Sequence, residues 1–319
     1  MESFPIVDVS YYYQHFCNET VPSLEFLTDK FVNKIADELL SAFQDWGFVY
    51  LKGTGFSPEY VQSLFDSSRE FFHQSLEEKN RVLCNSSDLS NPFGYVPFKF
   101  ETFDRNKPFD LKEAFDYLPW ITEDIKSKLP QKFSVMMNDM FSKCHVLTMR
   151  LLRLLNLALR IEDPQFLEKA HKFTSIQGKN HTILRSLYYP GVDKSLIQPS
   201  QSRCGEHTDY GTITLLFQDE TGGLEVQSPN GNFIHATPIP NTIVVNAADL
   251  LERWTSGKIK STKHRVVSLG NPEKPRQCIA FFCQPDDEVL VSCLDGSDTY
   301  QPVNSFNFLK ERLLSSYTK

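Results

Sequence analysis

The sequence predicts a mixed α/β fold, with helices in the first half, a sandwich or jelly roll of short strands in the second half, and a helix at the end. Apolar residues recur at helical spacing in several segments before residue 160, whereas short β-rich runs separated by turn signals follow after residue 210. No long helical segments separate these runs, as a parallel βαβ sheet would require. The 319 residues, 40% of them hydrophobic, suffice for one catalytic unit with a substantial core.

The helices are predicted from periodicity and capping residues. Between Phe31 and Phe43 apolar residues recur at four-residue spacing, and Gly47 follows where a helix end favours a left-handed residue. Ser57-Pro58 supplies the cap and first turn of a second helix. Met136–Ala158 predicts a long third helix packed on the sheet, and Asn304–Tyr317 predicts a terminal helix that folds back over the barrel mouth.

The strands and one long loop are predicted from β-rich runs and turn residues. The expected strands are Thr212–Gln218, Leu224–Val226, Thr242–Asn246, Lys260–Val267 and Arg276–Phe282. The segment Asn85–Pro108, rich in Ser, Asn, Asp and Pro, predicts a long ordered loop. Since loops of that size are often functional, its Tyr95 and Phe98 are candidates for a pocket lid.

The triplet His207-Thr208-Asp209 is the most informative signal of chemistry. Residues two apart on an extended strand point to the same side, so the imidazole of His207 and the carboxylate of Asp209 can reach one ion together. Taken alone, the pair also fits a hydrogen-bonded strand end. A second imidazole from a distant strand, such as His264, would complete a set of two His and one carboxylate. That set leaves three positions of an octahedral ion open and is typical of non-haem Fe(II) oxygenases.

Several ordered segments carry a family resemblance. In the second half they are Cys204–Gly211, Asn246–Thr255, Lys260–Val266 and Arg276–Phe282; in the first half they are Phe4–Val9, Asp45–Leu51, Gly94-Tyr95 and Asp110–Phe115. They resemble the iron/ascorbate-dependent oxidoreductases, the 2-oxoglutarate and Fe(II)-dependent dioxygenases that include isopenicillin N synthase and the plant gibberellin and flavonoid oxygenases. The resemblance spans nearly the whole chain. It implies a double-stranded β-helix (jelly roll) core at residues 176–288, an N-terminal helical and substrate-loop region at 1–175, and a C-terminal helix packed on the core at 289–319.

The resemblance also implies roles for individual residues. It makes His207, Asp209 and His264 the Fe(II) ligands and assigns Arg276 to the distal carboxylate of the co-substrate 2-oxoglutarate. A planar guanidinium grips a carboxylate in a bidentate way that Lys cannot match; the alternative is a surface arginine at a strand start. The implied reaction uses O2, converts 2-oxoglutarate to succinate and CO2, and hydroxylates or desaturates a small organic molecule, with ascorbate as reductant.

Two departures concern the 2-oxoglutarate site. Cys278 stands where the family usually has Ser or Thr, and a thiol is a weak donor, so we expect reduced co-substrate affinity or a substitute hydroxyl. Before Pro190, we align Tyr189 with the family Tyr that reaches the oxoacid. Arg185, or Tyr188 on the opposite face, is then available to meet the substrate.

A third departure, Ala248 in place of a common Gly, is minor. Its neighbours Asn246 and Asp249 are interpreted as holding the turn and backbone near the site.

Composition restricts partners and location. The net charge of −7 includes no basic run interleaved with aromatics, which argues against nucleic acid. No apolar stretch approaches the roughly 20 residues of a membrane helix, and the N-terminus lacks a leader pattern, so no membrane partner is expected. Seven cysteines without a Cys-x-x-Cys pair predict reduced thiols and a cytoplasmic or nuclear location. The sequence does not specify the oligomeric state or the primary substrate.

Three alternatives remain open from the sequence. An Fe(II) oxidase of the isopenicillin N synthase type, independent of 2-oxoglutarate, is left open by Cys278 and opposed by Arg276. A non-catalytic ligand-binding member would keep the fold, and a hydroxylase of protein or nucleic acid would need an open, charged groove. A pocket lined by Phe217, Phe281 and Phe282 would instead favour a small, partly apolar molecule.

Overall fold

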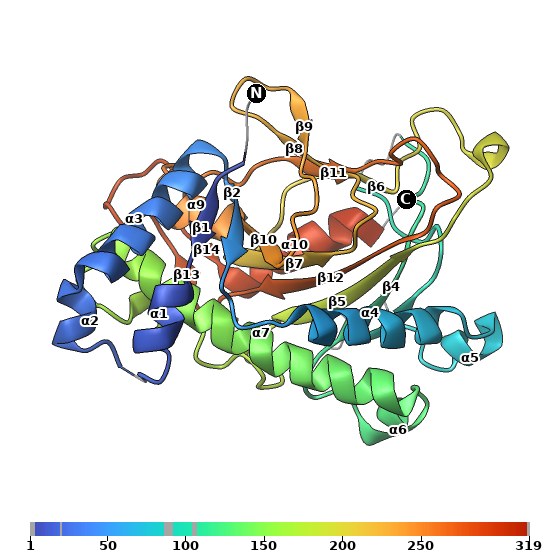
Figure 1. Ribbon diagram of the computed structural model, residues 1–319, viewed down its shortest axis with the longest axis horizontal. Coiled ribbons are helices and arrows are strands. Elements are labelled where there is room, and N and C mark those ends of the chain that lie inside the picture. Colours follow the sequence, from blue (N-terminus) through green and yellow to red (C-terminus); the bar gives the residue numbers. More distant parts are fainter. Residues whose placement is uncertain (1–3, 20, 86–91, 104–106, 318–319) are drawn as a thin grey trace.

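Two β-sheets face each other, and helices cover the outer side of the larger one (Figure 1). The computed structural model describes residues 4–19, 21–85, 92–103 and 107–317. Parts of the predicted loop, residues 86–91 and 104–106, lie outside the described residues, as does the extreme N-terminus.

The larger sheet has eight strands. In spatial order they are β1 (Ile6–Asp8), β2 (Phe48–Lys52), β10 (Thr242–Ala247), β7 (Ile213–Gln218), β12 (Arg276–Cys283), β5 (Ile183–Tyr189), β4 (Glu113–Tyr117) and β3 (Gly94–Val96). All neighbours pair antiparallel except β1 and β2. Strands from the first half of the chain therefore extend both edges of the sheet.

The smaller sheet completes the predicted jelly roll. Its order is β6 (Cys204–His207), β11 (His264–Val266), β8 (Leu224–Gln227) and β9 (Phe233–His235). A two-stranded ribbon of β13 (Leu290–Val291) and β14 (Val303–Asn304) follows. The predicted mixed α/β fold is confirmed.

Helices surround this core. They are α1 (Ser10–His15), α2 (Leu24–Thr28), α3 (Lys30–Asp45), α4 (Pro58–Phe72), α5 (Leu76–Asn80), α6 (Glu123–Ser127), α7 (Gln131–Ala158), α8 (Phe166–Lys169), α9 (Asp249–Trp254) and α10 (Ser305–Tyr317), with a 3-10 turn at Lys194–Leu196. The long α7 contacts β5, β7 and β12, and α4 contacts β5. Their apolar faces and the outer face of the sheet form the main hydrophobic core.

The helix boundaries follow the local signals in the sequence. The Ser57 hydroxyl accepts a hydrogen bond from the backbone N–H of Tyr60 at 3.2 Å and caps α4, as predicted. Gly47, just after α3, has a φ of +67°, and a Cβ there would lie 2.4 Å from the carbonyl oxygen of Lys260. Glycine is therefore required both by the backbone conformation and by the close approach of the chain that leads to β11.

Successive side chains of β12 point to opposite faces of the sheet, either into the interior of the roll or toward the helices. Arg276, Cys278 and Ala280 face the interior, whereas Ile279 and Phe281 belong to the core under the helices. The prediction that Phe281 lines the pocket is therefore wrong. It is also wrong for Phe217 on β7, whose side chain belongs to the same core under the helices. Phe282 does face the interior of the roll.

The predicted lid residue Tyr95 is also misplaced. Its side chain is 1% exposed on β3, packs against Phe71 and donates a hydrogen bond to Glu113 at 2.6 Å. Tyr95 is a core residue because β3 interrupts what the sequence predicted as one continuous loop.

Candidate metal and co-substrate site

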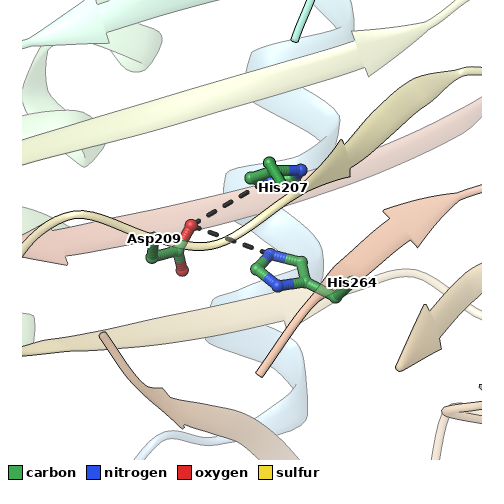
Figure 2. Close-up of side chains that lie close together, drawn as sticks. All are labelled: His207, Asp209 and His264. Carbon is green, nitrogen blue, oxygen red and sulfur yellow. Dashed lines mark ion pairs between the residues drawn. The ribbon is translucent and has the colours of Figure 1, made fainter. Parts of the chain in front are cut away.

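Three ligand-type side chains meet inside the roll. His207 ends β6 and His264 begins β11, and the antiparallel register places these two residues opposite each other. Asp209 lies just beyond β6, with its Oδ1 3.8 Å from His207 Nε2 and 3.7 Å from His264 Nε2 (Figure 2). Ligand atoms from the three residues lie within 4.8 Å of one another. Since first-row divalent ions bind N and O at about 2.0–2.2 Å, small side-chain rotations allow one ion to reach all three.

The backbone orients both imidazoles for metal binding. His207 Nδ1 lies 2.8 Å from the carbonyl oxygen of Gly205, and His264 Nδ1 lies 3.1 Å from that of Thr262. A carbonyl oxygen can only accept, so each Nδ1 carries the proton and each Nε2 keeps a lone pair for the ion. Burial lowers the pKa of both imidazoles, to about 4 for His264, so both are neutral at pH 7.

Asn246 fixes the carboxylate of Asp209. Its Nδ2 donates to Oδ2 at 2.7 Å, which leaves Oδ1 directed toward the two imidazoles. Burial acts to raise the pKa of Asp209, but the imidazoles of His264 and His207 and the bond from Asn246 hold it below its ordinary value. The carboxylate is therefore ionised, as a metal ligand must be.

Arg276 lies at the other end of the same interior space, a cavity of about 70 Å³ that the three ligand residues also line. Its Nε donates to the carbonyl oxygen of Gly222 at 2.7 Å, its Nη1 lies 3.4 Å from Cys278 Sγ, and its guanidinium lies 4.8 Å from the centre of the Tyr189 ring. Nη2 has no hydrogen-bond partner among the described residues, and the side chain is 0% exposed. A buried permanent cation with an unused donor is costly unless an anion joins it.

A second buried arginine adds positive charge here. Arg203 donates to the carbonyl oxygens of Pro272 and Lys274, and burial together with the neighbouring Arg276 lowers its pKa. This end of the cavity therefore suits a carboxylate, and the other end suits a divalent ion, as 2-oxoglutarate and Fe(II) require.

Comparisons with known proteins agree with this geometry. Residues 180–285 match the 2OG-Fe(II) oxygenase superfamily, and residues 21–138 match the family described as non-haem dioxygenase in morphine synthesis N-terminal. A 2-oxoglutarate-Fe(II) type oxidoreductase of Metarhizium rileyi is 30% identical, over 88% of this chain and 85% of that protein. A full-length Neurospora crassa protein crystallised in complex with alpha-KG is 33% identical, with a TM-score of 0.79 over 98% of this chain and 96% of that one.

The chain belongs to the 2OG-Fe(II) oxygenase superfamily. It is a 2-oxoglutarate and Fe(II)-dependent dioxygenase, as the sequence predicted. The oxidase alternative and the non-catalytic alternative are not favoured by these relatives.

The remaining predicted site residues of this dioxygenase divide between the two faces of the sheet. Arg185 and Tyr189 face the interior of the roll. Tyr188 lies on the opposite face, where it stacks on Phe72 and contacts His73 Nε2 at 3.0 Å. Tyr188 is therefore not placed to meet a substrate beside the metal ligands.

The backbone N–H of Asp249 donates to the carbonyl oxygen of Asp209 at 2.9 Å, so Asp249 holds the turn near the site, as interpreted from the sequence. Its side chain makes further contacts. It accepts hydrogen bonds from Ser261 Oγ at 2.6 Å and from Arg312 at 2.9 Å. Because Arg312 lies on α10, this contact ties the terminal helix to the loop region that carries the metal ligands.

A second cavity of the dioxygenase, of about 110 Å³, also adjoins His207 and Asp209. Phe103 stacks on the His207 ring there, with ring centres 4.1 Å apart and planes at 5°. Glu101 and Asp116 also line this space, and the sequence reasoning missed all three residues. The predicted loop was a correct signal for Phe103 and Glu101, but Tyr95 was wrongly selected from it.

Proposed function

We propose that His207, Asp209 and His264 hold Fe(II), and that Arg276 binds the distal carboxylate of 2-oxoglutarate, while a small organic substrate is hydroxylated or desaturated in the adjoining cavity. The unpartnered Nη2 of the fully buried Arg276 is the observation that carries this proposal. Bound Fe(II) supplies O2 activation coupled to oxidative decarboxylation of 2-oxoglutarate to succinate and CO2. Ascorbate serves as the reductant that keeps the iron in the Fe(II) state.

The protein residues position the reactants and exclude water. The Arg276 fork donates to both oxygens of a carboxylate, while Tyr189 and Cys278 lie beside it. The Cys278 thiol replaces the expected hydroxyl, and burial raises its pKa, so it stays neutral and does not repel the carboxylate. Asn246 holds Asp209 so that one oxygen faces the metal position. Leu309 and Leu313 of α10 contribute apolar side chains to the lining of the substrate cavity.

The names of relatives support a small, nitrogen-containing substrate. Homoarginine-6-hydroxylase of Glycine max is 29% identical over 93% of this chain and 90% of that protein. The Neurospora crassa protein has also been crystallised with alpha-KG and thymine, and that chain is 32% identical with a TM-score of 0.79. Homoarginine and thymine are both compact molecules that carry N–H groups.

We propose a cytoplasmic or nuclear location. All seven cysteines are free thiols, as a reducing compartment favours. In the part of the chain that the structure describes, no helix has the length and apolar character needed to span a membrane.

Succinate release tests the assignment. Purified protein with Fe(II), ascorbate and labelled 2-oxoglutarate should release succinate, and a mixture of small metabolites should contain a compound that stimulates it. Asp209→Ala should abolish both release and Fe(II) binding, whereas Asp139→Ala, which removes a surface carboxylate paired with Lys143, should retain them. Oxygen uptake without 2-oxoglutarate dependence, or equal turnover by Asp209→Ala, would overturn the proposal.

A further inference from the structure

The cavity of about 110 Å³ beside His207 and Asp209 has two kinds of wall. Its apolar wall comprises Pro92, Phe103, Ile183, Phe282, Leu309 and Leu313. Its polar wall comprises charged and amide side chains, among them Glu101, Asp116, Arg185, His181 and Gln284. Because the cavity adjoins the metal ligands, a substrate bound in it would present a carbon atom to the metal while its polar group meets the second wall.

A buried chain of alternating charges leads to this cavity. It runs through Asp110, Lys112, Glu101, Arg185 and Asp116. Lys112 Nζ lies 2.9 Å from Asp110 and 3.5 Å from Glu101. Arg185 lies 2.6 Å from Glu101 through Nη2 and 3.1 Å from Asp116 through Nε. Among the described residues of this chain of charges, three carboxylates face two cations, which leaves one negative charge in excess.

The two ends of the charge chain are not equivalent. At one end, Asp110 Oδ1 also accepts a hydrogen bond from the backbone N–H of Gly205 at 2.9 Å. At the other end, Asp116 Oδ1 forms an ion pair with Arg185 Nε at 3.1 Å without the geometry of a hydrogen bond, and it has no hydrogen-bond partner among the residues that the structure describes. Asp116 is only 2% exposed, and it lines the cavity. In the part of the chain that the structure describes, no second cation follows Asp116 at this end.

Other acceptor atoms in the same cavity also lack a hydrogen bond within the described residues. Glu101 Oε2, which faces Lys112 Nζ at 3.5 Å, and Gln284 Oε1 are buried without a hydrogen bond within the described ranges. His181 directs Nδ1 to Asp287 Oδ1 at 2.8 Å, and its Nε2 is likewise without a hydrogen-bond partner there. Buried acceptors without donors are costly, so a ligand rich in N–H groups would remove several penalties at once.

The charge balance selects among ligand classes. An anionic group would have to displace Glu101 from Arg185 at 2.6 Å and would add to the excess negative charge. A neutral group would leave the buried Asp116 carboxylate with only a shared cation, Arg185, among the described residues, and burial raises the pKa of that carboxylate to about 7 despite the Arg185 charge. A cationic group offsets the excess negative charge and donates hydrogen bonds to the acceptor oxygens that lack them.

We propose that this cavity recognises a substrate with a cationic nitrogen group, an ammonium, amidinium or guanidinium, whose N–H groups donate to Asp116 and Glu101. The carbon part of the substrate lies against Phe103 and Phe282, next to the metal ligands. This inference rests on the proposed function, because it names the substrate class of the same site.

The test compares three probes with the same tail length and different charge: butylguanidinium, butylurea and pentanoate. Each is titrated anaerobically by calorimetry into the full-length protein loaded with Fe(II) and 2-oxoglutarate. Wild type should bind butylguanidinium at least tenfold more tightly than butylurea, and pentanoate more weakly still. Asp116→Asn should reduce butylguanidinium affinity by about 10- to 100-fold, the range expected for losing a buried charge-assisted bond, and leave 2-oxoglutarate affinity within about twofold. Asp139→Asn makes the same chemical change on the surface and should retain the preference.

The outcomes separate this inference from the proposed function. Succinate release without added probe is measured in the same preparations. If release is present but butylurea or pentanoate binds as well as butylguanidinium, or if folded Asp116→Asn keeps the cation preference, the inference is wrong and the dioxygenase assignment stands. If Asp116→Asn is unstable, the inference is still tested, because the charge preference of wild type is measured without any variant. If wild type releases no succinate, the proposed function fails and this substrate assignment fails with it.

Discussion

Replacing Arg276 with lysine tests how the co-substrate is held. In the structure, Nε is used by the carbonyl oxygen of Gly222 at 2.7 Å, Nη1 lies 3.4 Å from Cys278 Sγ, and Nη2 is available. A carboxylate can therefore take two parallel bonds from Nη1 and Nη2. Lysine keeps the charge but offers one ammonium point and no fork, so it loses one charge-assisted bond of about 1.5–3 kcal/mol. That loss corresponds to a roughly 10- to 150-fold rise in the Kd for 2-oxoglutarate.

The assay is anaerobic titration of 2-oxoglutarate into Fe(II)-loaded protein, followed by succinate release as a function of its concentration. The apparent KM should rise with the Kd, and kcat at saturation should change much less, because the lost bond holds the far end of the molecule. Arg150→Lys is the matched control, since Arg150 donates to the carbonyl oxygen of Cys17 at 2.9 Å, away from the cavity. An unchanged Kd in Arg276→Lys, or an equal rise in Arg150→Lys, would refute the assignment of the carboxylate to Arg276.

Three further predictions concern the surroundings of the site. Cys278→Ser should lower the Kd for 2-oxoglutarate by about two- to fivefold, because a hydroxyl is a stronger donor than a thiol; an unchanged or higher Kd by calorimetry would contradict this. Asn246→Ala removes the 2.7 Å bond to Asp209 and should weaken Fe(II) binding by about 10- to 100-fold in a metal titration, and unchanged metal affinity would disprove the role. Burial lowers the pKa of His171 from 6.5 to about 4, so the native state resists protonation that the unfolded chain accepts. The stability advantage of wild type over His171→Gln, measured by urea unfolding, should therefore be full above pH 6.5 and fall by up to about 3 kcal/mol as the pH approaches 4; a pH-independent difference would be inconsistent with this account.

The parts of the fold and site that local signals specify could be predicted from sequence. Ser57 caps α4 and Gly47 follows α3 because capping and left-handed backbone depend on a few consecutive residues. The His207 and Asp209 pair was recognisable because a two-residue spacing on a strand fixes a common side. The partner His264 needed the family resemblance, since only the register of β6 and β11 brings it to the same place.

Features that depend on distant strand pairing were missed. The short strands β1, β3 and β4 carry no strong alternation of their own and are stabilised by neighbours far along the chain. The burial of Asp116 beside Arg185 follows from the register of β4 and β5, which pairs these two residues directly. Phe217 and Phe281 were assigned to the wrong face because apolar composition does not reveal which side of a doubly covered strand faces the cavity.

The two binding functions of the interior are separated along a single strand. On β5, Tyr189 lies at the Arg276 end and Arg185 at the Asp116 end, and both face inward. Four residues of extended chain span roughly 13 Å, so Arg185 and Tyr189 lie well apart, although the two cavities share a middle section lined by His207, Asp209 and Arg185. Substitutions around Arg185 can therefore change which small molecule binds without altering how Arg276 binds the carboxylate of 2-oxoglutarate. For the same reason, we expect a variant of the substrate cavity to keep normal 2-oxoglutarate affinity. The charge preference of the cavity can then be measured without a change in co-substrate binding.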